Sequence, residues 1–132
     1  MRAESQKINF PGFEAVEGMR VDDGTANGLT RCVLNLLRLK NHHGERINTT
    51  GISTQTKDGI RWRATNNTIG SADIHALING RAVYIEVKIG RDTQSEAQKE
   101  YQKSVEDSGG LYWIIKNFNQ FESKYKELTG EQ

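Results

Sequence analysis

Three charged residues lie close together in a stretch that is otherwise typical of β-strands. Asp73 precedes the apolar run Ile74 to Ile78, while Glu86 and Lys88 lie two residues apart at the end of the run that starts at Ala82. Because side chains alternate along a strand, Glu86 and Lys88 point to the same face. Burying such charges is costly unless they are paired or hold an ion. Two carboxylates suit Mg²⁺ or Mn²⁺, and the lysine could hold a phosphate oxygen or an attacking water.

The turn between the two runs brings these charges to one end of a hairpin. Asn79-Gly80 is the dipeptide favoured in a type I′ turn, so strands are predicted on both sides of it. An alternative needs no chemistry: Glu86 and Lys88 could form a solvated ion pair on an edge strand. Both interpretations stay open at this point.

The same residues resemble the PD-(D/E)XK nuclease superfamily, most closely its virus-type replication-repair nuclease (VRR-NUC) branch, which is related to Holliday-junction resolvases. The resemblance covers about residues 44 to 118 and rests on Gly70 to Asp73, Ile85 to Lys88, Ser95 to Gln98, and the break at Gly109-Gly110. It implies an α/β fold with a restriction-endonuclease-like αβββαβ core, in which helices flank a central mixed β-sheet.

The resemblance also implies an activity and a role for each residue. The protein would be a metal-dependent DNA endonuclease that hydrolyses phosphodiester bonds and leaves 5′-phosphate and 3′-hydroxyl ends. Asp73 and Glu86, with the main-chain carbonyl of Val87, would hold Mg²⁺ or Mn²⁺. Lys88 would orient the attacking water or stabilise developing charge, and Gln98 would position that water.

One expected ligand is missing from the first helix. An apolar stripe from Leu29 to Leu37 predicts an amphipathic helix over Ala26 to Asn41, which contains no Asp or Glu. We take Asn27 as the candidate outer ligand in place of the acid that family members often carry there, with Glu14 or Glu17 of the arm as alternatives. The missing acid favours an alternative function, a catalytically silent nucleic-acid-binding module on the same fold. A third hypothesis is an unrelated α/β interaction domain.

Cationic residues are concentrated in one part of the chain although the formal net charge is only +1. Residues 29–68 contain seven Lys and Arg against two acidic residues. Trp62, between two arginines, could stack on a splayed base or pack into the core. A short catalytic domain has little surface for reading bases, so junction or flap DNA is the expected substrate, with a sequence-specific restriction enzyme as the alternative. The candidate nucleic-acid-binding residues are Arg46, Arg61, Trp62, Arg63 and Arg91.

Length and composition set the organisation of the chain. Its 132 residues predict an N-terminal arm over residues 1–23 and a nuclease domain over residues 24–132. Apolar residues in the arm are the expected homodimer interface. Cys32 lies in an apolar run and is predicted to be a buried thiol.

The motifs that are missing limit the other possibilities. No membrane-span pattern, signal-peptide core or nucleotide-binding loop is found, so we expect an intracellular protein, cytoplasmic or nucleoid-associated, that uses no nucleotide cofactor and binds no membrane. The virus-type branch is compatible with a phage-encoded protein. The histidines and the single cysteine have no structural zinc spacing.

The remaining elements follow from local patterns. Residues 45–50 predict a short strand, and residues 51–69 an irregular loop or a short hairpin. A helix capped by Thr93 or Ser95 should reach Ser108. Residues 111–115 form a continuous apolar run, which predicts a buried central strand, and residues 118–128 predict a closing helix.

Overall fold

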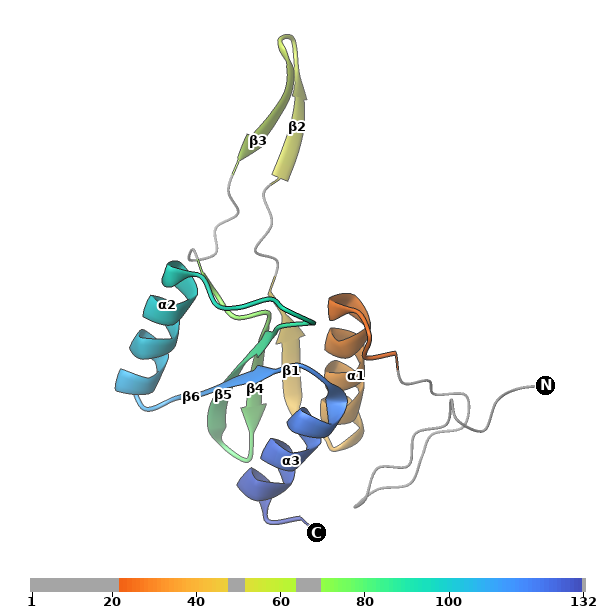
Figure 1. Ribbon diagram of the computed structural model, residues 1–132, viewed down its shortest axis with the longest axis vertical. Helices are drawn as coiled ribbons and strands as arrows, with labels where there is room; N and C mark the ends of the chain where they lie inside the picture. Colours follow the sequence, from red (N-terminus) through yellow and green to blue (C-terminus); the bar gives the residue numbers. More distant parts are fainter. Residues whose placement is uncertain (1–21, 48–51, 64–69, 132) are drawn as a thin grey trace, which may run out of the picture.

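The structure is a computed structural model that describes residues 22–47, 52–63 and 70–131. These residues form three helices and two β-sheets (Figure 1). The elements are α1 (Ala26–Leu39), β1 (His43–Arg46), β2 (Ile52–Thr56), β3 (Gly59–Arg63), β4 (Ile74–Ile78), β5 (Arg81–Val87), α2 (Glu96–Asp107), β6 (Leu111–Ile115) and α3 (Phe118–Thr129).

The main sheet has four strands in the order β1-β4-β5-β6. β4 is antiparallel to both β1 and β5, whereas β6 runs parallel to β5 after a crossover through α2. The sheet is therefore mixed, which confirms the predicted α/β class with a mixed sheet and flanking helices. β2 and β3 form a separate two-stranded hairpin, one of the two structures expected for residues 51–69.

The central hairpin forms as its turn dipeptide predicts. Asn79 and Gly80 have φ values of 50° and 81°, the left-handed conformation that a type I′ turn requires. The register places Ile78 opposite Arg81 and Ile74 opposite Ile85. This register fixes which side chains of β4 and β5 share a face.

Each helix begins at a side-chain cap. Thr25 accepts a hydrogen bond from the Gly28 N–H at the start of α1, and Asn117 accepts one from Gln120 at the start of α3. α1 ends at Leu39, two residues before the predicted end, because Asn41 turns the chain with a φ of 63°. Asp23 also accepts a hydrogen bond from the Phe118 N–H, which ties the segment before α1 to α3.

The helices cover the two faces of the main sheet unequally (Figure 1). α1 and α3 pack on one face, and their apolar side chains form a continuous core with alternate residues of β4, β5 and β6. α2 packs against the other face, where a smaller cluster contains Ala72, Val105 and Tyr112. Cys32 lies in the larger core, which confirms the predicted buried thiol, and burial raises its pKa.

The prediction of a central position for residues 111–115 is wrong for the described sheet. β6 has β5 on one side and no described strand on the other. Its apolar side chains are nevertheless mostly buried, because α2 and α3 cover its two faces. The apolar run therefore predicted burial correctly but not strand order.

No helix among the described residues has the length and apolar character that crossing a membrane requires.

Candidate functional site

The three charged residues of the central hairpin meet on the face that α2 covers. Asp73 directly precedes β4, and since Ile74 pairs with Ile85, Asp73 lies opposite Glu86. Lys88 follows β5 two residues after Glu86, and its Nζ lies 3.8 Å from Glu86 Oε2. The structure thus brings the three residues together, as strand alternation predicts.

Asp73 is held at the point where β4 begins. Its Oδ2 accepts a hydrogen bond of 2.8 Å from the Val87 N–H, and its main-chain carbonyl accepts one of 2.8 Å from the Ile47 N–H. The side chain of Asp73 therefore continues the β4–β5 pairing past the last backbone pair. Because the N–H and C=O of one strand residue point to the same side, the carbonyl of Val87 also points towards Asp73.

Glu86 is the most deeply buried charged residue described. Its relative exposure is 2%, and two side chains from other elements hold its carboxylate. The Tyr112 hydroxyl donates to Oε1 at 3.0 Å, and Gln98 Nε2 donates to Oε2 at 2.9 Å. Donors from β6 and α2 thus fix a carboxylate that β5 carries.

The capping box of α2 sets the orientation of the Gln98 amide. The Ser95 side chain accepts from the Gln98 N–H, and Gln98 Oε1 accepts from the Ser95 N–H at 2.9 Å. With its carbonyl oxygen engaged in the cap, the amide turns its NH₂ group to Glu86. Gly70 allows the loop before Asp73 to pass this turn, because a Cβ on Gly70 would lie 2.5 Å from the Ala97 carbonyl oxygen.

The electrostatics of the cluster favour a protonated Glu86. Burial and the neighbouring carboxylate of Asp73 raise the pKa of Glu86 to about 7, against the opposing effects of the Tyr112 hydrogen bond and the Lys88 charge. Two carboxyl groups side by side with only one nearby lysine leave unbalanced negative charge when both are ionised. A bound cation, or a proton on one of the two carboxyl groups, would therefore stabilise the site.

Aromatic residues extend the cluster along the same face. The His75 and Tyr84 rings pack edge to face with centroids 4.4 Å apart, and the Tyr101 hydroxyl lies 3.2 Å from His75 Nε2. Burial lowers the pKa of His75, so its imidazole is neutral at pH 7. Burial and the Glu86 charge raise the pKa of Tyr112, which keeps its hydroxyl a donor.

Asn27, Arg46 and Arg91 are the other predicted site residues whose side chains the structure describes, and within the described residues none of them forms a hydrogen bond or ion pair with this cluster. Asn27 is exposed in the first turn of α1, and α1 packs on the opposite face of the sheet. Arg46 is exposed on β1, and Arg91 is exposed in the loop between β5 and α2. Arg61, Trp62 and Arg63 belong to β3, but their side chains lie outside the described part of the structure. Residues 1–21 of the predicted arm lie outside it as well.

Tyr112 is the residue at this site that sequence reasoning missed. It lies in an apolar run whose pattern predicts a buried strand but no functional residue. A tyrosine within such a run usually needs a partner for its hydroxyl, and this requirement was the available signal. The parallel register places Tyr112 beside Tyr84, on the face that also carries Glu86.

The donor set determines what the cluster could hold. Over residues 22–47, 52–63 and 70–131, no group of three or more His, Cys, Asp or Glu side chains is arranged to bind a metal ion. Asp73 and Glu86 offer two carboxylates, and Val87 offers a carbonyl. Such an incomplete set of oxygen donors is compatible with Mg²⁺ or Mn²⁺, because Mg²⁺ usually retains several waters. Lys88 adds a cation able to bind a phosphate oxygen.

Comparison with known proteins adds no family assignment. No protein-family model matches the chain, and no curated protein matches its sequence. The cluster around Glu86 is therefore the basis on which a function can be argued.

Proposed function

We propose that this chain is a metal-dependent DNA endonuclease with a PD-(D/E)XK-type core. The observation that carries the proposal is the meeting of Asp73, Glu86 and Lys88 on one face, with Gln98 bound to Glu86. Leaving out the β2–β3 hairpin, the elements up to β6 follow the order αβββαβ, which supports the nuclease core named by the sequence resemblance. Junction or flap DNA is the proposed substrate.

The residues of the cluster have distinct proposed roles. Asp73, Glu86 and the carbonyl of Val87 would hold Mg²⁺ or Mn²⁺, which would polarise the phosphodiester and lower the pKa of a bound water. Lys88, whose side chain is only 13% exposed, would hold a non-bridging phosphate oxygen beside the carboxylates. Gln98 would keep the Glu86 carboxylate turned towards Asp73.

A catalytically silent nucleic-acid-binding module is the second candidate. Both carboxylate oxygens of Glu86 already accept hydrogen bonds from the protein, and the exposed Asn27 supplies no third acid. These observations favour a site that has kept its fold and lost its chemistry. The two candidates differ in cleavage rather than in DNA binding.

Cleavage of a panel of labelled DNAs tests the proposal. Single-stranded, duplex, flap and four-way-junction DNAs are incubated with Mg²⁺, Mn²⁺ or EDTA and with wild type, Lys88→Ala or Lys103→Ala. Lys103 is the matched control, because its side chain is 77% exposed and forms an ion pair with Asp107 on α2, away from the cluster. We expect metal-dependent cleavage that Lys88→Ala lowers by about 10²-fold or more and that Lys103→Ala leaves unchanged.

The other outcomes separate the hypotheses. Cleavage that survives both Lys88→Ala and Glu86→Ala would contradict the site assignment. Binding of junction DNA without cleavage in either metal would favour the silent module. Neither binding nor cleavage would favour an unrelated interaction domain.

A further inference from the structure

The two edges of the main sheet differ in how well they are protected against another strand. β1 forms one edge with the short sequence His-Gly-Glu-Arg, and its His43, Glu45 and Arg46 are exposed. β6 forms the other edge with Leu-Tyr-Trp-Ile-Ile, which contains no charge and no proline. Charged residues and short length are the usual protection of an edge strand, and β6 lacks the charges. An apolar unprotected edge indicates a strand-pairing surface.

The backbone of β6 presents hydrogen-bonding groups to that edge. The Ile115 carbonyl accepts from the Lys88 N–H and so points towards β5. Because backbone groups alternate between the two sides of a strand, those of Tyr112 and Ile114 point to the outer edge. No described strand pairs with these groups.

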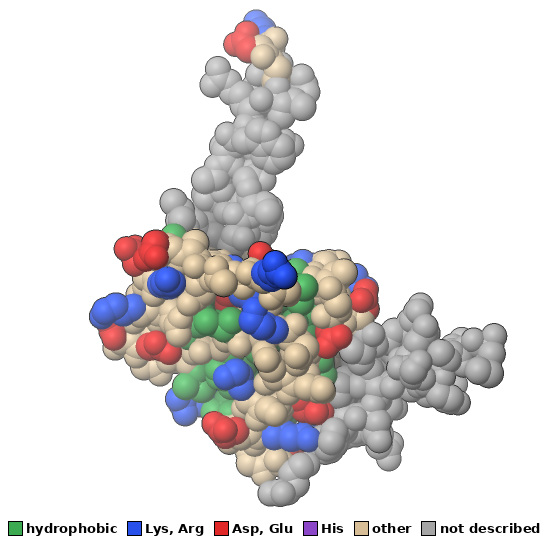
Figure 2. Space-filling view, in the orientation of Figure 1, with side chains coloured by type: hydrophobic (Ala, Val, Ile, Leu, Met, Phe, Trp, Pro, Cys, Tyr) green, Lys and Arg blue, Asp and Glu red, His purple; other side chains and the backbone are tan. Residues whose placement is uncertain are grey.

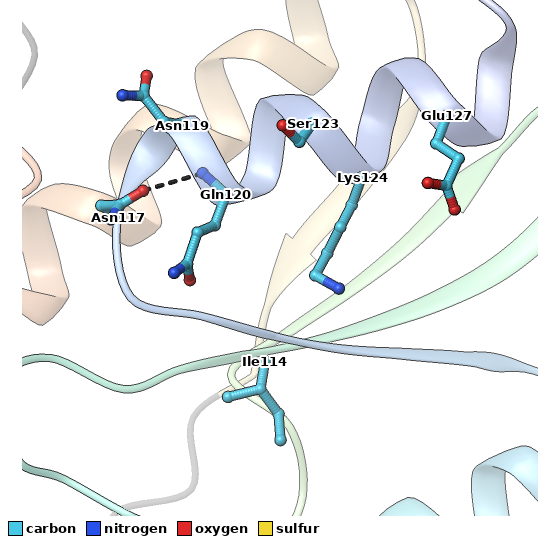
Figure 3. Close-up of a pocket in the computed structure, with 7 residues that line it drawn as sticks. All are labelled: Ile114, Asn117, Asn119, Gln120, Ser123, Lys124 and Glu127. Carbon is cyan, nitrogen blue, oxygen red and sulfur yellow. Dashed lines mark hydrogen bonds between the residues drawn. The ribbon is translucent and has the colours of Figure 1, made fainter.

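An open groove of about 670 Å³ lies along the same edge, between β6 and one side of α3 (Figure 3). Figure 3 shows the side chains of Gln120, Lys124 and Glu127 extending from α3 towards β6, while that of Ile114 points away from the helix. Figure 2 shows hydrophobic side chains reaching the surface over β6 beside Lys and Arg side chains. The groove therefore combines an apolar strand edge with a charged helix side.

The charges on α3 are arranged to complement a second copy. Lys124 and Glu127 lie one helical turn apart and are exposed, and neither has an ion-pair partner among the described residues. In a twofold-symmetric contact the same surface meets itself in reverse direction. Antiparallel α3 helices would then place Lys124 of each copy near Glu127 of the other.

We propose that two copies of this chain pair through β6 and α3. The β6 strands run antiparallel, with Tyr112 of one copy hydrogen-bonded to Ile114 of the other, and join the two sheets into one. The α3 helices lie side by side on one face of this sheet, where the Lys124 and Glu127 pairs fix the alignment. This interface uses residues outside the predicted arm, and it does not depend on nuclease activity.

Charge reversals test the interface by sedimentation equilibrium, over a concentration series up to roughly 100 µM. Wild type should be dimeric. Lys124→Glu and Glu127→Lys should each weaken the dimer about tenfold or more, because every cross-copy pair becomes repulsive. An equimolar mixture of the two variants should dimerise again, and so should the double variant, because opposite charges then face each other. Both substitutions lie on an exposed helix side and should leave the fold intact.

A backbone variant tests the strand pairing itself. Ile114→Pro removes the N–H that points to the outer edge and leaves the pairing with β5 in place, so it should yield a folded monomer. Ile114→Ala keeps that N–H and should remain more dimeric than the proline variant. A monomeric wild type would overturn the proposal and leave the edge to a strand from another protein. Single reversals that dimerise like wild type, or a mixture that stays monomeric, would overturn it as well.

Discussion

The two faces of the main sheet bury different kinds of side chain. Among the described residues, the sheet side chains buried beneath α1 and α3 are apolar, including Ile74, Ile85 and Trp113. The face beneath α2 buries Glu86 together with Tyr112. Neighbouring residues of the same strand thus meet very different surroundings.

The apolar face therefore contributes mainly to stability, whereas the face with Glu86 carries the candidate functional site. An apolar side chain stabilises the fold by about 1.5–3 kcal/mol when it is fully buried. A carboxylate in the same position lowers stability unless donors or a cation compensate for its lost hydration. The donors Gln98 and Tyr112 compensate in part, since the pKa of Glu86 remains raised to about 7. Burial of Glu86 therefore lowers the stability of the fold, and burial of apolar side chains on the other face must offset this loss.

The largest effect is expected from a cavity on the apolar face. Phe121 is fully buried against Trp113, Phe118 and Tyr125. Phe121→Ala should lower the free energy of unfolding by about 3–5 kcal/mol, measured by urea denaturation. Leu77→Ala is the control on the other face, where Leu77 is 50% exposed, and it should change stability by about 0.5 kcal/mol or less. Similar losses in both variants would contradict the contrast between the faces.

The second effect is a pH dependence that originates on the polar face. The folded state binds the Glu86 proton more tightly than the unfolded chain, because the pKa of Glu86 rises from 4.5 to about 7 on folding. In EDTA, the contribution of Glu86 to the free energy of unfolding should therefore be fully present below about pH 4.5. It should fall by on the order of 3 kcal/mol as the pH rises through 7. Glu86→Gln should remove this fall, whereas Glu100→Gln, at an exposed position, should keep it. Identical pH profiles for wild type and Glu86→Gln would contradict the buried-carboxyl assignment.

The smallest effect comes from one hydroxyl at the same carboxylate. Tyr112→Phe removes the donor to Glu86 Oε1 and should lower stability by about 1–2 kcal/mol at pH 8, and by less at pH 5, where Glu86 is protonated. Tyr101→Phe is the control, because its hydroxyl contacts His75 instead. Urea denaturation at both pH values measures the difference. A loss that is equal at the two pH values would show that Tyr112 does not act through the Glu86 charge.

Local patterns predicted most of what depends on neighbouring residues. Alternation placed Glu86 and Lys88 on one face, and Asn79-Gly80 marked the turn that brings Asp73 to them. Ser95 caps α2 as one of the two candidates. Each of these features spans few residues, so the geometry of a single strand, turn or helix end determines it.

The features that sequence reasoning missed depend on how distant elements pack. An apolar run predicts burial for Trp113 and Ile115, but strand order depends on where the crossover through α2 returns to the sheet. The helical pattern alone makes Asn27 a candidate ligand, whereas the packing of α1 on the face opposite Glu86 depends on the tertiary structure. Tyr112 was missed for the same reason, because its partner lies 26 residues away in sequence.

The sequence separations between hydrogen-bonded residues of the Glu86 cluster indicate the order in which the cluster forms during folding. Val87 and Asp73 are 14 residues apart within one hairpin, whereas Gln98 and Tyr112 follow Glu86 by 12 and 26 residues. Local hairpins form before contacts of large sequence separation. In a partly folded chain Glu86 would stand in water and ionise at its ordinary pKa until β6 docks beside β5. Between about pH 4.5 and 7, docking of β6 would then be accompanied by proton uptake at Glu86, so completion of the fold and protonation of its central carboxylate become one event.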